Sequence, residues 1–144
     1  MEIFIRQISR EDAPTVTALC HQLGYNPSIE QTLESIEAIL NNKDHDGFVA
    51  IHENKVIGWI GVCQAIQIES PRCCEIRGLV VDNLYRNRGV GKMLIEKAKS
   101  WSRETGNKKL RLRCNMKRTE THLFYQHLNF KEVKEQKVFE IDTW

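Results

Sequence analysis

The sequence has no long hydrophobic run and no large excess of charge of either sign. No stretch approaches the about 20 apolar residues of a membrane-spanning helix, and the start, MEIFIRQISRED, lacks the apolar core of a secretory signal. We therefore expect no membrane association and, by elimination, a cytoplasmic location. The 21 Lys and Arg residues against 19 Asp and Glu residues give a net charge of +2, which is too small a surplus for a dedicated nucleic-acid binder.

Cysteine is scarce and shows no metal or disulfide pattern. The count is odd, and no C-x-x-C pair occurs among Cys20, Cys63, Cys73, Cys74 and Cys114. We expect reduced thiols that pack as small hydrophobic residues, with a catalytic thiol as the alternative. His122 and His127 lie five residues apart, whereas two metal ligands on one helical face need a spacing of about four, so we expect no metal site.

Internal repeats, low-complexity tracts and long linkers are also absent, and only three prolines interrupt the chain. With 144 residues, of which 41% are hydrophobic, the chain can build one core. We therefore predict a single domain over residues 1–144.

What is present begins with a predicted strand over residues 3–8, where hydrophobic and polar residues alternate. Ser9 then precedes an acidic first turn, and Gly24 is placed to end the helix that follows. Ser28 and Gln31 form a capping-box pattern, which predicts the start of a second helix.

The centre of the chain is typical of antiparallel strands. The segments FVAIHE and VIGWIGVCQAIQIE flank the polar pair Asn54-Lys55, which predicts two strands joined by a tight turn, and CCEIRGLVV continues the sheet. A charged loop then leads to a helix from Val90, which Gly106 is placed to end.

The last part of the chain predicts a strand in LRLRC, a helix from about Thr119 to Leu128 and a closing hairpin in FKEVKEQKVFEI. The complete order is β-α-α-β-β-β-α-β-α-β-β. It predicts an α/β (α+β) fold with a mixed, mostly antiparallel central sheet of about six or seven strands and about four helices. The closing strand offers an edge with which a second subunit could form a homodimer.

The segment CEIRGLVVDNLYRNRGVGKMLIEKAKSW places a strand, a loop with two glycines and an amphipathic helix in direct succession. The first N–H groups of a helix lack partners, and the helix dipole adds roughly half a positive charge there. Glycine lets a ligand approach the backbone, and arginine and lysine supply countercharge. We therefore predict a pyrophosphate site at Arg86, Asn87, Arg88, Gly89, Val90, Gly91 and Lys92.

Two common phosphate-binding motifs do not fit this turn. The phosphate loop of NTPases needs glycine where Arg86 stands and Ser or Thr where Met93 stands. The dinucleotide fingerprint needs a third glycine where Leu94 stands, and it usually opens the first strand-helix unit of a parallel sheet. What remains is Arg86-x-x-Gly89-x-Gly91 after the strand EIRGLVV.

This pattern resembles the acetyl-CoA signature of the GNAT superfamily of N-acetyltransferases, and the predicted order of elements is similar to the GNAT order over nearly the whole chain. The resemblance implies that acetyl-CoA is the acetyl donor. It also implies that the central strand pairs with the pantetheine arm through its backbone, and that one polar and one aromatic residue contact the cofactor. These positions are Leu79, Val80, Val81, Asn115 and Tyr125.

Acyl transfer to an amine needs a base for the amine proton, an oxyanion site and a proton for the thiolate. Glu75 is the candidate base, because several GNAT enzymes carry a glutamate at a similar position; a solvent-facing strand end is the alternative. Tyr125 is the candidate acid, since a phenol has an ordinary pKa near 10, and core packing is the alternative. A backbone N–H around Val81 is the simplest oxyanion site.

The sequence thus leads to an acetyl-CoA-dependent N-acetyltransferase that acts on a primary amine by direct transfer through a ternary complex. The acceptor stays open among a small molecule, a peptide N-terminus and a lysine side chain. The alternative is a GNAT-like domain that binds CoA as a regulatory or structural ligand and has little transfer activity.

Overall fold

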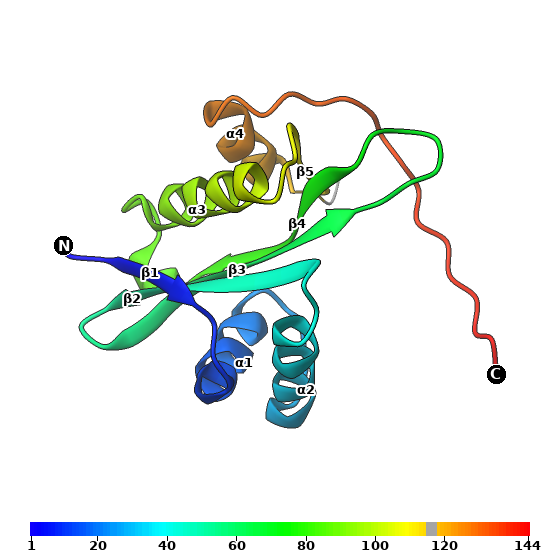
Figure 1. The fold of residues 1–144 in the computed structure, drawn as a ribbon. Helices are drawn as coiled ribbons and strands as arrows, with labels where there is room; N and C mark the ends of the chain where they lie inside the picture. The colour runs from blue at the N-terminus through cyan, green and yellow to red at the C-terminus, as the bar shows by residue number, and fades with distance from the viewer. Residues whose placement is uncertain (115–117) are drawn as a thin grey trace. The chain divides into compact units, whose positions relative to one another are not determined.

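The computed structural model describes residues 1–114 and 118–144, and their contacts form two units, residues 1–113 and residues 114–144. The first unit is built on a five-stranded sheet of order β1-β2-β3-β4-β5, antiparallel except for the β4–β5 pair (Figure 1). Its strands are β1 (Phe4–Gln7), β2 (His45–His52), β3 (Lys55–Ala65), β4 (Cys73–Val81) and β5 (Leu110–Leu112). Its helices are α1 (Ala13–Gln22), α2 (Ile29–Leu40) and α3 (Val90–Glu104), and the second unit contains α4 (Thr119–His127). None of these helices is long and apolar enough to cross a membrane in the part of the chain that is described.

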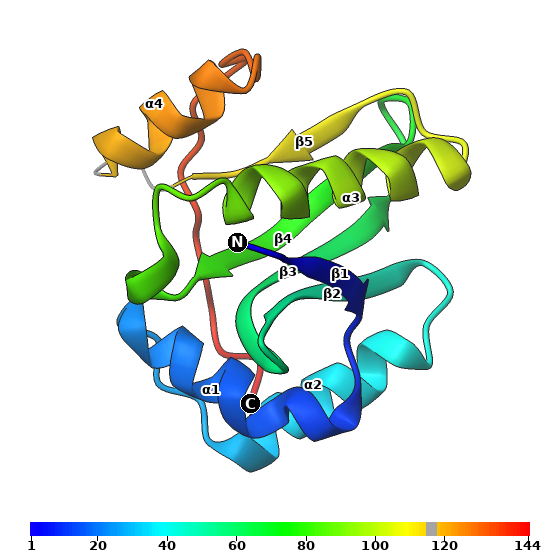
Figure 2. The ribbon, with the colours of Figure 1, turned by 90° about the vertical axis from the view of Figure 1, so that its left-hand side faces the viewer.

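Helices α1 and α2 cover one face of the sheet and α3 covers the other (Figures 1 and 2). Side chains alternate between these faces along each strand. A Cβ on Gly58 would meet Leu94 and Val90 of α3, so Gly58 faces α3 and its neighbour Trp59 faces α1 and α2. We call the two sides of the sheet the α3 face and the α1–α2 face.

Helix starts and ends follow the local sequence signals. The Ser28 hydroxyl accepts from the N–H of Gln31 at 3.1 Å, and the Gln31 side chain accepts from the N–H of Ser28 at 2.9 Å, which confirms the predicted capping box of α2. Gly24 follows α1 with φ +87° and Gly106 follows α3 with φ +82°, the left-handed conformation that glycine adopts at helix ends.

The turn between β2 and β3 lies one residue earlier than predicted. Its central residues are Glu53 and Asn54, with φ of 49° and 62°, while Lys55 already belongs to β3 and pairs with His52. Two left-handed residues suit the right-handed twist of a two-residue hairpin. The expected turn at Asn54-Lys55 is therefore corrected by one position.

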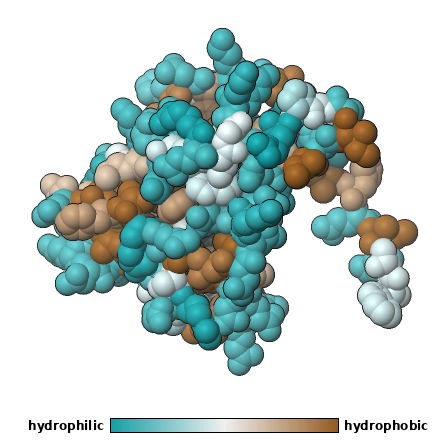
Figure 3. All heavy atoms as spheres, viewed as in Figure 1, coloured by the Kyte–Doolittle hydropathy of each residue, from teal (hydrophilic) through white to brown (hydrophobic). Residues whose placement is uncertain are grey.

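The predicted closing hairpin is wrong, and the sheet has five strands rather than six or seven. Residues 130–144 contain no helix or strand, and Val133, Val138, Phe139 and Ile141 are all exposed. Brown spheres mark hydrophobic residues along this C-terminal segment in Figure 3. The predicted hairpin FKEVKEQKVFEI has no Gly, Asn or Asp at which a tight turn would form, and a two-stranded hairpin alone is marginally stable.

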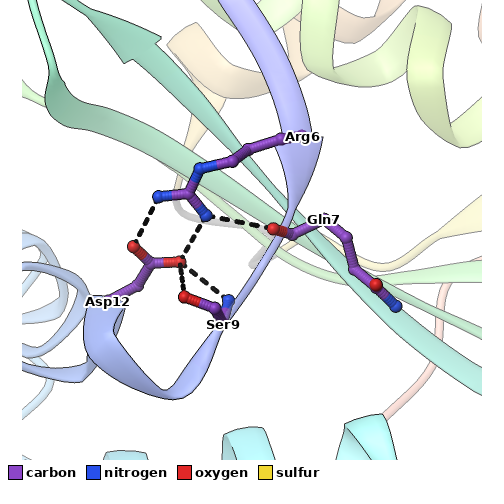
Figure 4. A network of polar contacts seen from close by, with 4 residues as sticks. All are labelled: Arg6, Gln7, Ser9 and Asp12. Carbon is purple, nitrogen blue, oxygen red and sulfur yellow. Dashed lines mark hydrogen bonds and ion pairs between the residues drawn. The ribbon is translucent and has the colours of Figure 1, made fainter.

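A buried carboxylate joins β1 to the start of α1 (Figure 4). Arg6 donates to both oxygens of Asp12 at 2.8 Å, and the N–H of Ser9 donates to Asp12 Oδ2 at 2.8 Å. Arg6 Nη1 also donates to the carbonyl of Gln7 at 3.0 Å. Burial alone would raise the pKa of Asp12, but the hydrogen bonds and the charge of Arg6 outweigh it, so the pKa lies below its ordinary value of 3.8.

We predict that Asp12→Asn lowers the free energy of unfolding by about 2 kcal/mol near neutral pH, because it removes a buried charge-assisted network. Since the native pKa of Asp12 is depressed, this contribution is present above pH 3.8 and is lost as the pH falls through the lower native value. Urea unfolding of wild type and variant at neutral pH and at about pH 3 measures the difference.

The matched control is Glu37→Gln, which breaks the exposed Arg10–Glu37 ion pair of 2.9 Å. We expect a change below about 0.5 kcal/mol for it. An equal loss for Asp12→Asn at both pH values would contradict the electrostatic account.

Candidate active site

The chain leaves β4 through a short 3-10 turn, Asn83–Tyr85, and enters α3 through four exposed residues, 86–89. Asn87 and Gly89 have left-handed φ of 61° and 81°, and Gly89 is the N-cap of α3. Val90 is buried, so the first helical residue anchors the turn to the core. The turn thus presents its backbone to solvent directly beside the helix N-terminus.

The N-terminus of α3 has Gly89 as its N-cap residue but no side-chain cap. The first backbone bond of the helix runs from the N–H of Met93 to the carbonyl of Gly89 at 3.0 Å, so the N–H groups of Val90, Gly91 and Lys92 precede it. No side chain caps the helix and no acidic residue lies in its first turn. Such a helix end can hold an anion through several N–H groups at once.

Positive side chains surround the same helix end. Arg86, Arg88 and Lys92 are all exposed, and the guanidinium of Arg88 lies 5.9 Å from the centre of the Tyr85 ring. A cation held over an aromatic face stays close to the turn. Of the predicted pyrophosphate residues, 86–89 and Lys92 are therefore exposed and carry three positive side chains, while Val90 is buried.

Strand β4 has a free backbone edge where the sequence placed the pantetheine arm. Its pairing with β5 covers only Cys74 to Ile76. The N–H of Asp82 donates across to β3 at 2.8 Å, so by alternation the backbone groups of Val81 and Leu79 point away from β3. No strand in the described part of the chain pairs with this edge beyond Ile76, and Val80 points its side chain into the α1–α2 core.

Glu75 lies on the α1–α2 face of β4, opposite Cys63 of β3, and is only 3% exposed. Arg77 and Arg113 both donate to its Oε1, at 3.0 and 2.8 Å. The alternative of a solvent-facing strand end is therefore wrong. Charge–charge contacts of this kind are what a buried carboxylate needs.

Sequence reasoning missed the two arginine partners of Glu75. Arg77 occupies the extra position of a β-bulge, since Gly61 pairs with Gly78 and Val62 pairs with Ile76. The bulge places Glu75 and Gly78, three residues apart, on the same face of the sheet, where regular alternation would put them on opposite faces. In the sequence, the only signal for this bulge is the glycine inside the strand segment EIRGLVV.

Tyr125 belongs to α4, in the second unit. Its ring packs edge-on against Phe124 and Phe130, with centroids 5.2 and 5.6 Å away. Burial raises the pKa of Tyr125 to about 12, the Cys114 thiol acts in the same direction and Arg118 acts against it. The phenol therefore keeps its proton throughout the neutral range.

Three cysteines behave as the sequence predicted. Cys63, Cys73 and Cys74 are buried, and burial raises the pKa of the Cys74 thiol to about 12, so it stays protonated and unreactive. Asn115, the predicted polar contact to the cofactor, lies outside the described residues. Among residues 1–114 and 118–144, no three potential metal ligands come together.

A strand with one open edge, followed by a glycine turn and an uncapped positive helix end, defines an α/β domain suited to an extended anionic ligand. The chain matches the acetyltransferase (GNAT) family over residues 5–130, and it belongs to that family.

An uncharacterized N-acetyltransferase of Chlorobaculum tepidum, CT2212, is 30% identical over 92% of this chain and 77% of its own length. Two solved structures share the fold at 22% identity: an aminoglycoside N-acetyltransferase, AAC(6')-Iy, in complex with CoA, and the glucosamine-6-phosphate N-acetyltransferase of Arabidopsis thaliana. Their TM-scores are 0.86 and 0.84; the first match covers 99% of this chain and 96% of the other, and the second covers 99% and 100%. Because these two enzymes are named for different acceptors, the shared fold does not specify the acceptor.

We predict that Gly89→Val raises the dissociation constant for acetyl-CoA at least about tenfold, as measured by isothermal titration calorimetry. The variant forces a β-branched residue into φ of 81° and places its side chain beside the open N–H groups of α3.

Gly106→Val is the matched control, because Gly106 has nearly the same φ, 82°, at the opposite end of the same helix. We expect it to lower the melting temperature similarly and to leave acetyl-CoA affinity unchanged. If the two variants bound acetyl-CoA with equal affinity, the prediction of an anion site at this turn would be wrong.

Proposed function

We propose that the chain is an N-acetyltransferase that moves the acetyl group of acetyl-CoA directly to a primary amine within a ternary complex. The observation that carries this proposal is the uncapped N-terminus of α3, which directly follows a strand with an open backbone edge. Family membership over residues 5–130, which reaches into both units, supports one functional domain over residues 1–144. The acceptor is a small molecule, a peptide N-terminus or a lysine side chain.

The cofactor's pyrophosphate would lie at residues 86–92, where N–H groups and three basic side chains meet it. The pantetheine arm carries amide groups, and the outward N–H and C=O groups of Leu79 and Val81 would pair with them as a further strand does. Asn115 is proposed as an additional polar contact, by resemblance to the family.

In the reaction, the neutral amine attacks the thioester carbonyl carbon and forms the new C–N bond. The oxyanion of the tetrahedral intermediate would accept from the outward N–H of Val81, which is fixed before the reaction starts. The C–S bond then breaks, the nitrogen loses a proton and the departing thiolate of CoA gains one.

Glu75 is the proposed acceptor of the amine proton, directly or through a water molecule. Both arginines bind its Oε1, so the carboxylate acts through its other oxygen or by exchanging a partner. The same ion pairs would also serve a purely structural carboxylate. This observation supports the second candidate, a domain that binds CoA and transfers acetyl groups poorly.

Tyr125 is the proposed hydrogen-bond donor to the leaving sulfur. With a pKa of about 12 it holds its proton at neutral pH, whereas a free thiol titrates near 8.5. Complete proton transfer from this phenol to the thiolate is therefore unfavourable at equilibrium. We propose that Tyr125 stabilises the thiolate by hydrogen bonding while solvent supplies the final proton.

We predict that Glu75→Gln lowers kcat by about 10²-fold and leaves the acetyl-CoA dissociation constant unchanged. Activity should recover partly at high pH, because an amine with pKa near 10 then loses its proton unaided. Steady-state CoA release measured at a series of pH values gives the pH profile of kcat. Thermal melting checks that the variant still folds although Arg77 and Arg113 have lost their counterion.

Glu96→Gln is the control, since it removes an exposed carboxylate 3.1 Å from Lys99 on α3. It should not change kcat. An unchanged kcat in Glu75→Gln would contradict the assignment of Glu75 as the base. It would favour the second candidate, a domain that binds CoA and transfers acetyl groups poorly.

We predict that Tyr125→Phe lowers kcat about tenfold, because it removes only the hydroxyl and keeps the ring contacts with Phe124 and Phe130. Pre-steady-state CoA release measures the chemical step. The exposed Tyr25 supplies the control variant Tyr25→Phe. A wild-type rate in Tyr125→Phe would leave the tyrosine a packing residue.

A further inference from the structure

A hollow of about 250 Å³ lies between α1, α2 and the sheet, wholly within residues 1–113. Its walls are mainly apolar side chains. They are Ile8, Val16, Cys20, Ile36, Ile39 and Trp59. The hydroxyl of Thr32, one of its few polar walls, already bonds Thr17 at 2.7 Å. The hollow is therefore suited to an apolar group and offers little to a hydroxylated one.

Two glycines in register border this hollow. Gly47 of β2 pairs with Gly61 of β3, so no side chain rises from the α1–α2 face at these two positions. A Cβ on Gly61 would meet only Trp59, at 3.8 Å, whereas a Cβ on Gly47 would meet Ile8 at 2.9 Å. Gly61 is thus the open part of the floor of the hollow. Gly78 of β4 continues the row beside Gly61 but lies under the Trp59 ring.

The Trp59 ring forms one wall. It lies across Gly78, where an added Cβ would come within 2.6 Å of the ring. Its indole nitrogen is buried and has no hydrogen-bond partner among the described residues. Burial raises the pKa of the neighbouring Cys20 thiol, and Trp59 acts in the opposite direction.

The next row on the same face contains Glu75. His45, Cys63 and Glu75 pair across the same three strands. Cys63 lies two residues beyond Gly61 along β3, which is about 7 Å. The proposed base therefore stands one side-chain row from the floor of the hollow, and an amine beside Glu75 can extend its substituent into that hollow.

We propose that this hollow selects the acceptor, and that the acceptor is a primary amine bearing a compact apolar substituent. The inference rests on the proposed function. An apolar cavity of about 150 Å³ is enough to bind benzene, so this one can hold a phenyl ring or a branched chain. Polyhydroxylated amines would bury hydroxyl groups against mainly apolar walls, where the polar side chains are those of Gln31, Thr32 and Ser35, and are poor acceptors.

The test measures kcat/KM at saturating acetyl-CoA for straight-chain amines from propylamine to hexylamine, for phenethylamine and for glucosamine. We expect an increase of about threefold per added methylene until the hollow is full. Phenethylamine should exceed glucosamine by at least about 100-fold. A flat series, or a preference for glucosamine, would overturn the proposal.

Two variants change the hollow in opposite directions. Gly61→Val fills it without backbone strain, because Gly61 lies in an extended strand and is not among the glycines with positive φ. It should flatten the chain-length series and leave acetyl-CoA affinity unchanged. Ile39→Ala enlarges the hollow and should move the optimum to a longer amine. If both variants showed the same dependence of kcat/KM on amine chain length as the wild type, the proposal would be overturned. Melting curves establish that each variant folds.

A binding measurement separates this proposal from the enzymatic one. Phenethylamine is titrated without acetyl-CoA while tryptophan fluorescence is followed, and saturable binding to wild type but not to Gly61→Val supports the hollow even if no amine releases CoA. If amines are acetylated with a kcat/KM that does not depend on the size of their apolar substituent, and phenethylamine does not bind, the acetyltransferase proposal stays intact and this one is overturned.

Discussion

Strand β4 pairs with β3 along nearly its whole length but with β5 over three residues only, so a stretch of its second edge has no strand partner among the residues that the structure describes. Backbone N–H and C=O groups in a folded core must find partners. The outward groups of Leu79 and Val81 therefore favour an extended ligand with amides of its own. Glu75 lies at one end of this strand and the glycine turn at the other. The proposed chemistry thus depends on how far β5 pairs with β4.

The two ends of the proposed site, the N-terminus of α3 and Glu75, differ in their charged and polar groups. At α3 the N-cap is Gly89, which has no side chain to accept from the first N–H groups of the helix, whereas the Ser28 hydroxyl caps α2. At Glu75 the opposite holds, because two guanidinium groups accompany one buried carboxylate. Positive side chains therefore lie both at the turn and around the proposed base.

Local signals predicted what depends on a few neighbouring residues. The capping box of Ser28 and Gln31, the helix-ending glycines and the glycine turn before α3 each occur where expected, because their geometry is decided within about one helical turn. The hairpin after Phe130 failed for the converse reason. Alternating hydrophobic residues indicate a strand only if another edge is there to pair with it.

Features that join distant segments were not predictable in this way. Gly47, Gly61 and Gly78 look like scattered glycines until strand register aligns them, and the bulge at Arg77 places Glu75 and Gly78 on the same face of β4.

The sequence by itself determined the order of the main elements, the family and the glycine turn before α3, since each is written in contiguous residues with a strong conformational preference. The tertiary structure alone decided which face of the sheet Glu75 occupies, which arginines hold it and where a hollow remains. Those outcomes depend on pairing register, and a shift of one residue would exchange the two faces of every strand.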